Sequence, residues 1–330
     1  MKRFWLIVAA VMFGVLLLPV RTPAPLVYQP GEGWTYESPG GAKWQRARAK
    51  EQLQVAQEAF AAGKHRLAAK AARRVVARWP LSDYAPGAQY LIGRCYEYRH
   101  RDARAFKEYQ KLIERYPKYE RFDEVLLHQF EIANRFLAGQ WFKLWGFIPF
   151  FPSMEKTADM YAKIVRNGPY SRIAPQAQLN LGVAREKQKD YFLAVKAYEK
   201  AADQYADQKA FAAEALYRAG RAWYMQAKTA EYDQSAAGNA IATFTDFIIL
   251  YPNDPRVPRL RTLISSLRTE QARGAYEIAR YYEKKHKLDG ARVYYNEVIR
   301  RAADSEYAAA AKERLAALNR ATAAAAAARP

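Results

Sequence analysis

The fold is decided by one stretch, Pro86 to Pro117, which reads PGAQYLIGRCYEYRHRDARAFKEYQKLIERYP. Apolar and small residues recur in it at intervals of three and four, and a polar break at Arg101–Asp102 separates two such runs. This spacing predicts two short helices and a turn, with one buried face on each helix. Gly93 stands where the two helices are expected to cross closely, and Pro117 is expected to stop the second helix.

The second half of this unit recurs along the whole chain. Its pattern is a small residue, an aromatic residue four positions later, an apolar residue three positions after that, and a proline after five more. Weaker copies lose the aromatic residue or the proline but keep the frame. The six copies are Ala68, Ala72, Val75, Pro80; Ala105, Tyr109, Leu112, Pro117; Thr157, Tyr161, Ile164, Pro169; Ala194, Tyr198, Ala201, Ala206; Ala240, Phe244, Phe247, Pro252; and Ala291, Tyr295, Val298, Ala303.

Six units in one frame resemble the tetratricopeptide repeat, a family whose helix pairs stack into a right-handed superhelix. All the copies are farther apart than the roughly 34 residues of that repeat, so insertions and longer linkers are expected between them. We therefore expect an all-α solenoid of about six helix pairs, and we find no alternating strand pattern of useful length. The expected domains are a repeat domain at 43–318 that ends in a capping helix, a Pro/Gly-rich extended segment at 25–42, and a frayed Ala-rich tail at 319–330.

The N-terminus has the pattern of an export signal. Lys2 and Arg3 precede an apolar run of 17 residues from Phe4 to Val20, so residues 1–24 are expected to be a signal peptide or an N-terminal membrane anchor. Cys95, the single cysteine, lies inside the second unit, so a lipid anchor at the N-terminus is not expected. A small core residue is the favoured interpretation of Cys95, and a reactive thiol is the alternative.

An aromatic insert interrupts the third unit between Leu137 and Thr157. A turn between helices is normally short and polar, so this insert is expected to bury its side chains somewhere. It could pack along the solenoid's own groove, dock a protein partner or enter a membrane interface, and Gly139 and Pro152 flank it in a way that suits a short hairpin. We hypothesise that it is a docking element. Its large apolar residues are Trp141, Phe142, Leu144, Trp145, Phe147, Ile148, Phe150 and Phe151.

The composition favours a binding protein over an enzyme. The four histidines are scattered, no phosphate-binding loop or nucleophile motif follows a strand, and no cofactor, metal site or small-molecule substrate is expected. The formal charge of +20 predicts affinity for something acidic. For an exported protein, acidic segments of client proteins, anionic lipid or lipopolysaccharide fit this charge better than nucleic acid does.

The sixth unit contains Tyr276-Glu277-Ile278-Ala279-Arg280-Tyr281-Tyr282, followed by Tyr294-Tyr295. This unit and the second are similar to the BamD family, whose members are a subunit of the bacterial outer-membrane β-barrel assembly machinery. This resemblance implies a periplasmic scaffold associated with the outer membrane, whose N-terminal repeats receive unfolded outer-membrane proteins and whose C-terminal repeats dock on a barrel-inserting, BamA-like partner. Another cell-envelope repeat adaptor, in cell division or bound to peptidoglycan, is the alternative.

Within this scheme we expect the first two repeats to present a concave face for extended or C-terminal peptide segments. One face of a helix in the second repeat carries polar and aromatic groups one turn apart, outside its packing stripe. The alternative is that these groups are simply solvated. The residues predicted to line the groove are Gln57, Phe60, Tyr90, Arg94 and Glu97.

Overall fold

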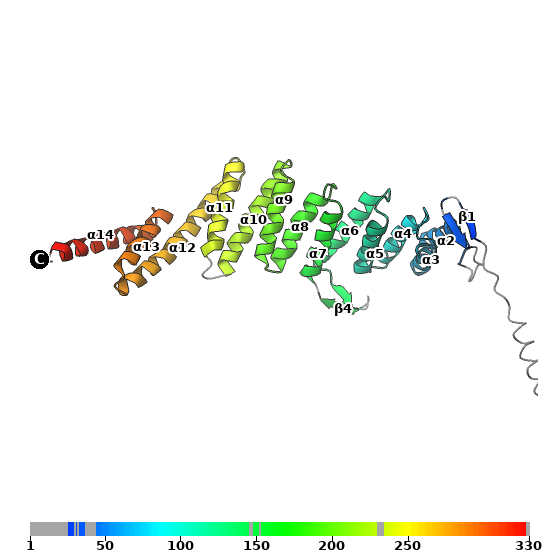
Figure 1. The fold of residues 1–330 in the computed structure, drawn as a ribbon, viewed down its shortest axis with the longest axis horizontal. Coiled ribbons are helices and arrows are strands. Elements are labelled where there is room, and N and C mark those ends of the chain that lie inside the picture. The colour runs from blue at the N-terminus through cyan, green and yellow to red at the C-terminus, as the bar shows by residue number, and fades with distance from the viewer. Residues whose placement is uncertain are drawn as a thin grey trace, which may run out of the picture. The chain divides into compact units, whose positions relative to one another are not determined.

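The computed structural model describes residues 26–29, 31, 33–36, 44–144, 148–151, 153–229 and 234–327. The described residues up to Val125 belong to one compact unit and those from Leu126 to a second, and each unit is built mainly from helices (Figure 1). The signal segment predicted at 1–24 lies outside the described residues. The helices are α2 (Ala49–Ala61), α3 (His65–Arg78), α4 (Ala85–Glu97), α5 (Asp102–Arg115), α6 (Phe122–Leu137), α7 (Met154–Asn167), α8 (Ala174–Lys187), α9 (Tyr191–Gln204), α10 (Lys209–Thr229), α11 (Gln234–Leu250), α12 (Val257–Lys284), α13 (Leu288–Arg301) and α14 (Glu306–Ala327).

Consecutive helices pack as pairs, one pair for each repeat. In the first unit α2 packs on α3 and α4 on α5; in the second unit α8 packs on α9, α10 on α11 and α12 on α13, and α14 covers α13. The third repeat joins α6 to α7, whose Tyr161 donates a hydrogen bond to Asn134 of α6. This arrangement confirms the predicted all-α fold of helix pairs.

The repeat frame marks the core of each pair. The small, aromatic and apolar positions that define the six copies in the sequence are all buried, with 1% or less of each residue exposed. They lie on the second helix of each pair, where spacings of three and four bring them onto one face. The hydrophobic core is therefore repeated along the chain and not concentrated in one centre.

Glycines let the two helices of a pair approach closely. A Cβ atom on Gly93 would lie 2.3 Å from Cε1 of Tyr109, and a Cβ atom on Gly182 would lie 2.3 Å from Cε1 of Tyr198. Neither distance is possible between real atoms, so the ring occupies the space that a side chain would need. The expected close crossing at Gly93 is therefore confirmed.

The buried tyrosine of the repeat also carries a hydrogen bond. Tyr109 donates to Glu97 at 2.8 Å, and the same pairing recurs at 2.6 Å in the fourth and sixth repeats. Each tyrosine stands twelve positions after its glutamate. Burial and the adjacent glutamate raise the pKa of Tyr109 well above its usual range, so its hydroxyl remains a donor.

Five of the turns inside the pairs, those that the structure describes, contain a residue with positive φ. His100, Lys189 and His286 have φ values of 51°, 63° and 57°, and Gly63 and Gly139 occupy the equivalent turns with positive φ. In the second repeat, Arg101 N donates to Tyr96 O at 2.9 Å across such a turn. This is the Schellman pattern, in which a left-handed residue ends a helix and its open carbonyls are capped.

Four short strands accompany the helices, and of their two hairpins only that of the third-repeat insert was expected from the sequence. β1 (Leu26–Gln29) pairs antiparallel with β2 (Gly33–Tyr36), and β3 (Phe142–Leu144) pairs antiparallel with β4 (Ile148–Phe151). Strands of three or four residues are too short for alternation to stand out in a sequence. The first hairpin lies on the repeats, because its turn residue Gly31 accepts a hydrogen bond from Asp83 N at 2.8 Å.

The last helix is longer than predicted, whereas α12, with 28 residues from Val257, is the longest of the described helices. α14 was expected to end near Leu318 with a frayed tail after Asn319, but it continues to Ala327. Alanine has the highest helix propensity, which explains why the alanine-rich segment stays helical.

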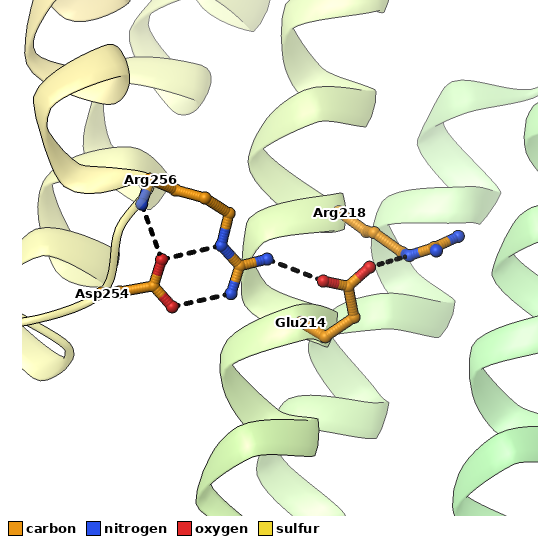
Figure 2. A network of polar contacts seen from close by, with 4 residues as sticks. All are labelled: Glu214, Arg218, Asp254 and Arg256. Atoms are coloured by element: carbon orange, nitrogen blue, oxygen red, sulfur yellow. Dashed lines mark hydrogen bonds and ion pairs between the residues drawn. The ribbon is translucent and has the colours of Figure 1, made fainter.

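A polar network ties the fifth repeat to the start of α12 (Figure 2). The guanidinium of Arg256 donates two hydrogen bonds to Asp254, each at 2.9 Å, and a third to Glu214 of α10 at 2.7 Å, and the backbone N of Arg256 also donates to Asp254 at 2.9 Å. Glu214 also accepts from Arg218 at 2.6 Å. The guanidinium of Arg256 lies 4.5 Å from the ring centre of Tyr217, so it is held by charge and by stacking together.

Among the helices that the structure describes, none combines the length and the apolar character needed to cross a membrane.

Candidate peptide-binding site

The candidate site lies on the first helices of the first two pairs, α2 and α4. These two helices are neighbours. They meet at Gly87 of α4, where an added Cβ atom would lie 3.8 Å from Leu53 Cδ2 of α2. The first residues of α6, up to Val125, belong to the same unit. Side chains that point away from the pairing surfaces of α2 and α4 therefore share one face.

An aromatic cluster forms one end of this face. Phe60 of α2 makes edge contacts with His65 and with Tyr98, at centroid distances of 5.1 and 5.2 Å. His65 stacks on Tyr98 at 5.1 Å. Tyr98 remains 53% exposed, so it presents ring surface to solvent although Phe60 and His65 fix its position.

Arg94 joins this cluster to the next helix. Its Nη1 donates to the hydroxyl of Tyr90 at 3.0 Å, and its guanidinium lies 5.3 Å from the ring centre of Tyr98. Tyr90 in turn donates a hydrogen bond to Glu124 at the start of α6. Burial and this bond to Glu124 raise the pKa of Tyr90 to about 12. The hydroxyl is therefore neutral at physiological pH and holds Arg94 and Glu124 on either side.

One sequence expectation about this face is wrong. Tyr90 was placed outside the packing stripe, but it is only 8% exposed and its ring packs 6.1 Å from that of Tyr109 and 6.0 Å from that of Tyr119. The ring of Tyr90 is part of the core, and only its hydroxyl reaches the polar cluster. An amphipathic side chain such as tyrosine serves both environments, which a helical wheel does not distinguish.

The five residues predicted to line the groove thus have different environments. Phe60, Tyr90, Arg94 and Glu97 belong to one connected cluster, in which Glu97 accepts from Tyr109. Gln57 is exposed on α2, and among the described residues no hydrogen bond or ring contact joins it to the cluster. The sequence analysis missed His65, Tyr98 and Glu124. Tyr98 stands one turn after Arg94, and that spacing was the signal available for it.

The chemistry of this face suits a peptide. Tyr98 offers an exposed ring that is held from behind, and an ordered aromatic ring of this kind binds apolar side chains at low entropic cost. Arg94 adds a planar cation whose side chain is 25% exposed. A guanidinium recognises carboxylates and backbone carbonyls.

The insert in the third repeat forms the β3–β4 hairpin in the second unit. At its base Phe142 is 7% exposed and stacks on Phe136 of α6 at 4.0 Å, with Lys156 Nζ 5.4 Å from its ring centre. Trp141 is 51% exposed. Trp145 and Phe147 lie outside the described residues, and of Leu144, Ile148, Phe150 and Phe151 only the strand backbone is described.

The helix pairs and their shared frame define the class of protein. A tetratricopeptide-repeat model matches residues 88–119, which is the stretch that carries the clearest unit. The chain is therefore a tetratricopeptide-repeat protein.

The particular family follows from the C-terminal half. The model of YfiO, described as an outer membrane lipoprotein, matches residues 153–329, more than half of the chain. The chain belongs to this family. A search of curated proteins found no significant match.

Solved structures with a similar fold are distant in sequence. The C-terminal part of a TPR repeat-containing protein from Cytophaga hutchinsonii is 15% identical, with 80% of this chain and 87% of that chain covered and a TM-score of 0.34. MamA from Desulfovibrio magneticus is 14% identical, with 63% and 97% covered and a TM-score of 0.30. A thermophilic TPR protein in Thermus thermophilus is 15% identical, with 67% and 98% covered and a TM-score of 0.29.

Proposed function

We propose that this chain is a non-enzymatic scaffold of outer-membrane protein assembly, which binds unfolded outer-membrane proteins and a barrel-inserting, BamA-like partner. Membership of the YfiO family supports a role at the outer membrane. The two binding functions are assigned to different regions. Client segments bind to α2 and α4, and the barrel-inserting partner docks on the C-terminal repeats that the family model covers.

The observation that carries the client-binding part is the face built around Tyr98 and Arg94. An exposed ring backed by Phe60 and His65 stands beside a cation held by Tyr90. A purely solvated helix face would not fix these groups through ring contacts and hydrogen bonds to neighbouring side chains. The face suits an extended segment with an aromatic residue near a free carboxylate, as at the C-terminus of a chain.

Site-specific photocrosslinking in cells tests this assignment. A photoreactive amino acid replaces Tyr98, and the control replaces Tyr170, which is 94% exposed but lies in the second unit. We expect crosslinks from position 98 to outer-membrane β-barrel precursors, identified by mass spectrometry, and none from position 170. Equal capture at both positions, or capture of no barrel precursor at position 98, would contradict the assignment.

We also propose that the β3–β4 hairpin docks a partner or a membrane surface. Phe142 and Phe136 anchor its base to α6, while Trp141 is half exposed. Deleting Gln140 to Pro152 and bridging the gap with a short glycine-serine linker should leave the protein folded and abolish co-purification of the partner or binding to vesicles that contain lipopolysaccharide. A collapse of the melting temperature would show instead that the hairpin is core.

Attachment to a membrane is assigned to the N-terminal segment. Cys95 is fully buried in α4, and burial raises the pKa of its thiol to about 11, so it is a core residue and not a reactive or lipid-bearing thiol. We propose export to the periplasm by residues 1–24, which act as a cleaved signal or remain as an anchor. N-terminal sequencing of the protein recovered from membranes distinguishes these two outcomes.

A further inference from the structure

The length of α12 opens a groove on the second unit. Its 28 residues are twice the 14 of α8, the first helix of the fourth repeat. Both α11 and α13 pack on α12, and Figure 1 shows them on separate parts of that helix. The space between the end of α11, the middle of α12 and the end of α13 is a groove of about 540 Å³.

The apolar part of the groove's lining, called its floor below, is formed by Ile248 and Ile249 of α11, Ile264 of α12 and Ala302. Hydroxyl side chains lie among them, including those of Thr245 and Ser265. Ile264 is buried, whereas Ile249 is 68% exposed at the edge, and its neighbour Leu250 is 62% exposed. Adjacent exposed aliphatic side chains beside a concave surface are typical of binding sites.

The rim of the groove is basic. Arg261 and Arg268 lie two turns apart on α12, and Arg300 and Arg301 contribute from α13. Asp304 is the one acidic residue among the described residues that line the groove. Seven helical residues correspond to about 10 Å along the axis, so Arg261 and Arg268 stand about 10 Å apart on one face.

The arginines on α12 are available for a partner. Arg300 and Arg301 both pair with Glu297. Arg261 and Arg268 are exposed, and neither forms an ion pair or hydrogen bond within the described part of the chain. Two uncompensated guanidinium groups above an aliphatic floor therefore select a ligand that is both acidic and apolar.

We propose that this groove binds an acidic, amphipathic peptide segment of a partner protein. The segment is helical, because its two carboxylates must stand about 10 Å apart on one face, which corresponds to seven positions in a helix. Aliphatic side chains between them lie on Ile248, Ile249 and Ile264. Guanidinium groups bind carboxylates through two parallel hydrogen bonds, which fixes the register of the segment. This inference is independent of the client-binding face on α2 and α4.

The test uses fluorescein-labelled synthetic peptides and the full chain. One peptide is helical, with glutamates seven positions apart and leucines between them on the same face. Its partner peptide has glutamine in place of each glutamate. Fluorescence anisotropy should show that the glutamate peptide binds about tenfold more tightly than the glutamine peptide, as expected for charge-assisted hydrogen bonds.

Variants assign the binding to the groove. The double variant Arg261→Gln/Arg268→Gln should lose the preference for glutamate. The control Arg259→Gln/Lys312→Gln removes the same charge at exposed positions outside the groove and should bind like wild type. Circular dichroism confirms that both variants are folded, as expected because all four side chains are exposed.

Three results would overturn the proposal. The first is equal binding of glutamate and glutamine peptides, including no binding of either. The second is a glutamate preference that persists in Arg261→Gln/Arg268→Gln or is lost equally in the control. The third is that the wild type binds phosphatidylglycerol vesicles but none of the peptides, and that vesicle binding requires Arg261 and Arg268. The groove would then be a lipid site.

Discussion

The second and fifth repeats solve the same packing problem with different chemistry. In both, an aromatic ring on the second helix fills the space above a glycine on the first, Tyr109 over Gly93 and Phe244 over Gly220. The hydroxyl of Tyr109 reaches Glu97, four positions after the glycine. In the fifth repeat the position four after the glycine is Tyr224, which packs with Phe244 in an apolar cluster.

The comparison separates what the fold requires from what it tolerates. The close approach of ring and glycine is common to both repeats, whereas the buried hydrogen bond occurs in one and not in the other. The fifth repeat has its ionic contacts elsewhere, in the network of Arg256, Asp254 and Glu214 (Figure 2). Packing of the ring against the glycine is therefore the feature that both helix pairs share, whereas their polar contacts differ.

The largest effect should come from filling the space below the ring. Gly93→Ala places a Cβ 2.3 Å from Tyr109, and Gly220→Ala places one 2.5 Å from Phe244. Both should lower the free energy of unfolding by about 1 to 3 kcal/mol, as overpacked cores do. Gly87→Ala on the same helix as Gly93 meets only Leu53, at 3.8 Å, and should stabilise by about 0.4 to 1 kcal/mol. Urea denaturation measures all three, and equal results for Gly87→Ala and Gly93→Ala would refute the role of ring packing.

The next effect concerns the network that is particular to the fifth repeat. Arg256→Met keeps the stem over Tyr217 and removes the ionic hydrogen bonds, so it should destabilise by about 1 to 2 kcal/mol after allowance for partial exposure. Arg273→Met removes a pair with Glu270 in which both side chains are more than half exposed, and it should leave the stability nearly unchanged. Thermal melting of the two variants compares them, and a similar loss in both would show that the network adds nothing beyond a surface ion pair.

The same network gives a pH dependence of known sign. Hydrogen bonds from Arg256 lower the pKa of Asp254 below its usual value, so the folded state binds this proton less readily than the unfolded state does. The resulting stability is present above the unfolded pKa of about 3.9 and is lost as the pH falls through the folded pKa. The stability difference between wild type and Asp254→Asn should therefore be largest near neutral pH and shrink below pH 4 or so. A difference that grows on acidification would have the wrong sign.

A smaller effect tests whether a hydroxyl on the buried ring stabilises a repeat only when a glutamate is present to accept its hydrogen bond. Tyr109→Phe removes the bond to Glu97 and should destabilise by about 1 kcal/mol. Phe244→Tyr introduces a hydroxyl beside the apolar cluster and should also destabilise by about 1 kcal/mol or more. Adding Tyr224→Glu should recover part of that loss, since it recreates the pair of the second repeat. A double-mutant cycle measures the coupling, and zero coupling would mean that the two repeats are not interchangeable.

The smallest effect is expected at the turn of the fourth repeat, which has the same left-handed conformation as the turn of the second repeat. Lys189 is exposed with a φ of 63°, a conformation that costs side chains with a Cβ but not glycine. Lys189→Gly should therefore stabilise by about 0.5 to 1 kcal/mol. Lys200→Gly, the same substitution inside α9, should destabilise by about 1 kcal/mol. If both variants lose stability, the left-handed turn is not strained.

The sequence by itself determined the repeat frame. Ala105, Tyr109 and Leu112 and their counterparts face inward because helical periodicity fixes which side chains share a face, whatever the rest of the chain does. Gly93 and Gly182 were predictable for the same reason, since a small residue one helix earlier marks a close crossing. The family resemblance drawn from these positions agrees with the match to YfiO.

Only the tertiary structure decided how the exposed and polar groups meet. Tyr98 touches Phe60, 38 positions earlier, and Arg256 reaches Glu214, 42 positions earlier. No local periodicity encodes such contacts, because they depend on the lengths of the turns and on the way successive helices pack. The groove on α12 exists for the same reason. Its arginines are two turns apart in the sequence, but the apolar floor between them forms only because a long helix holds α11 and α13 apart.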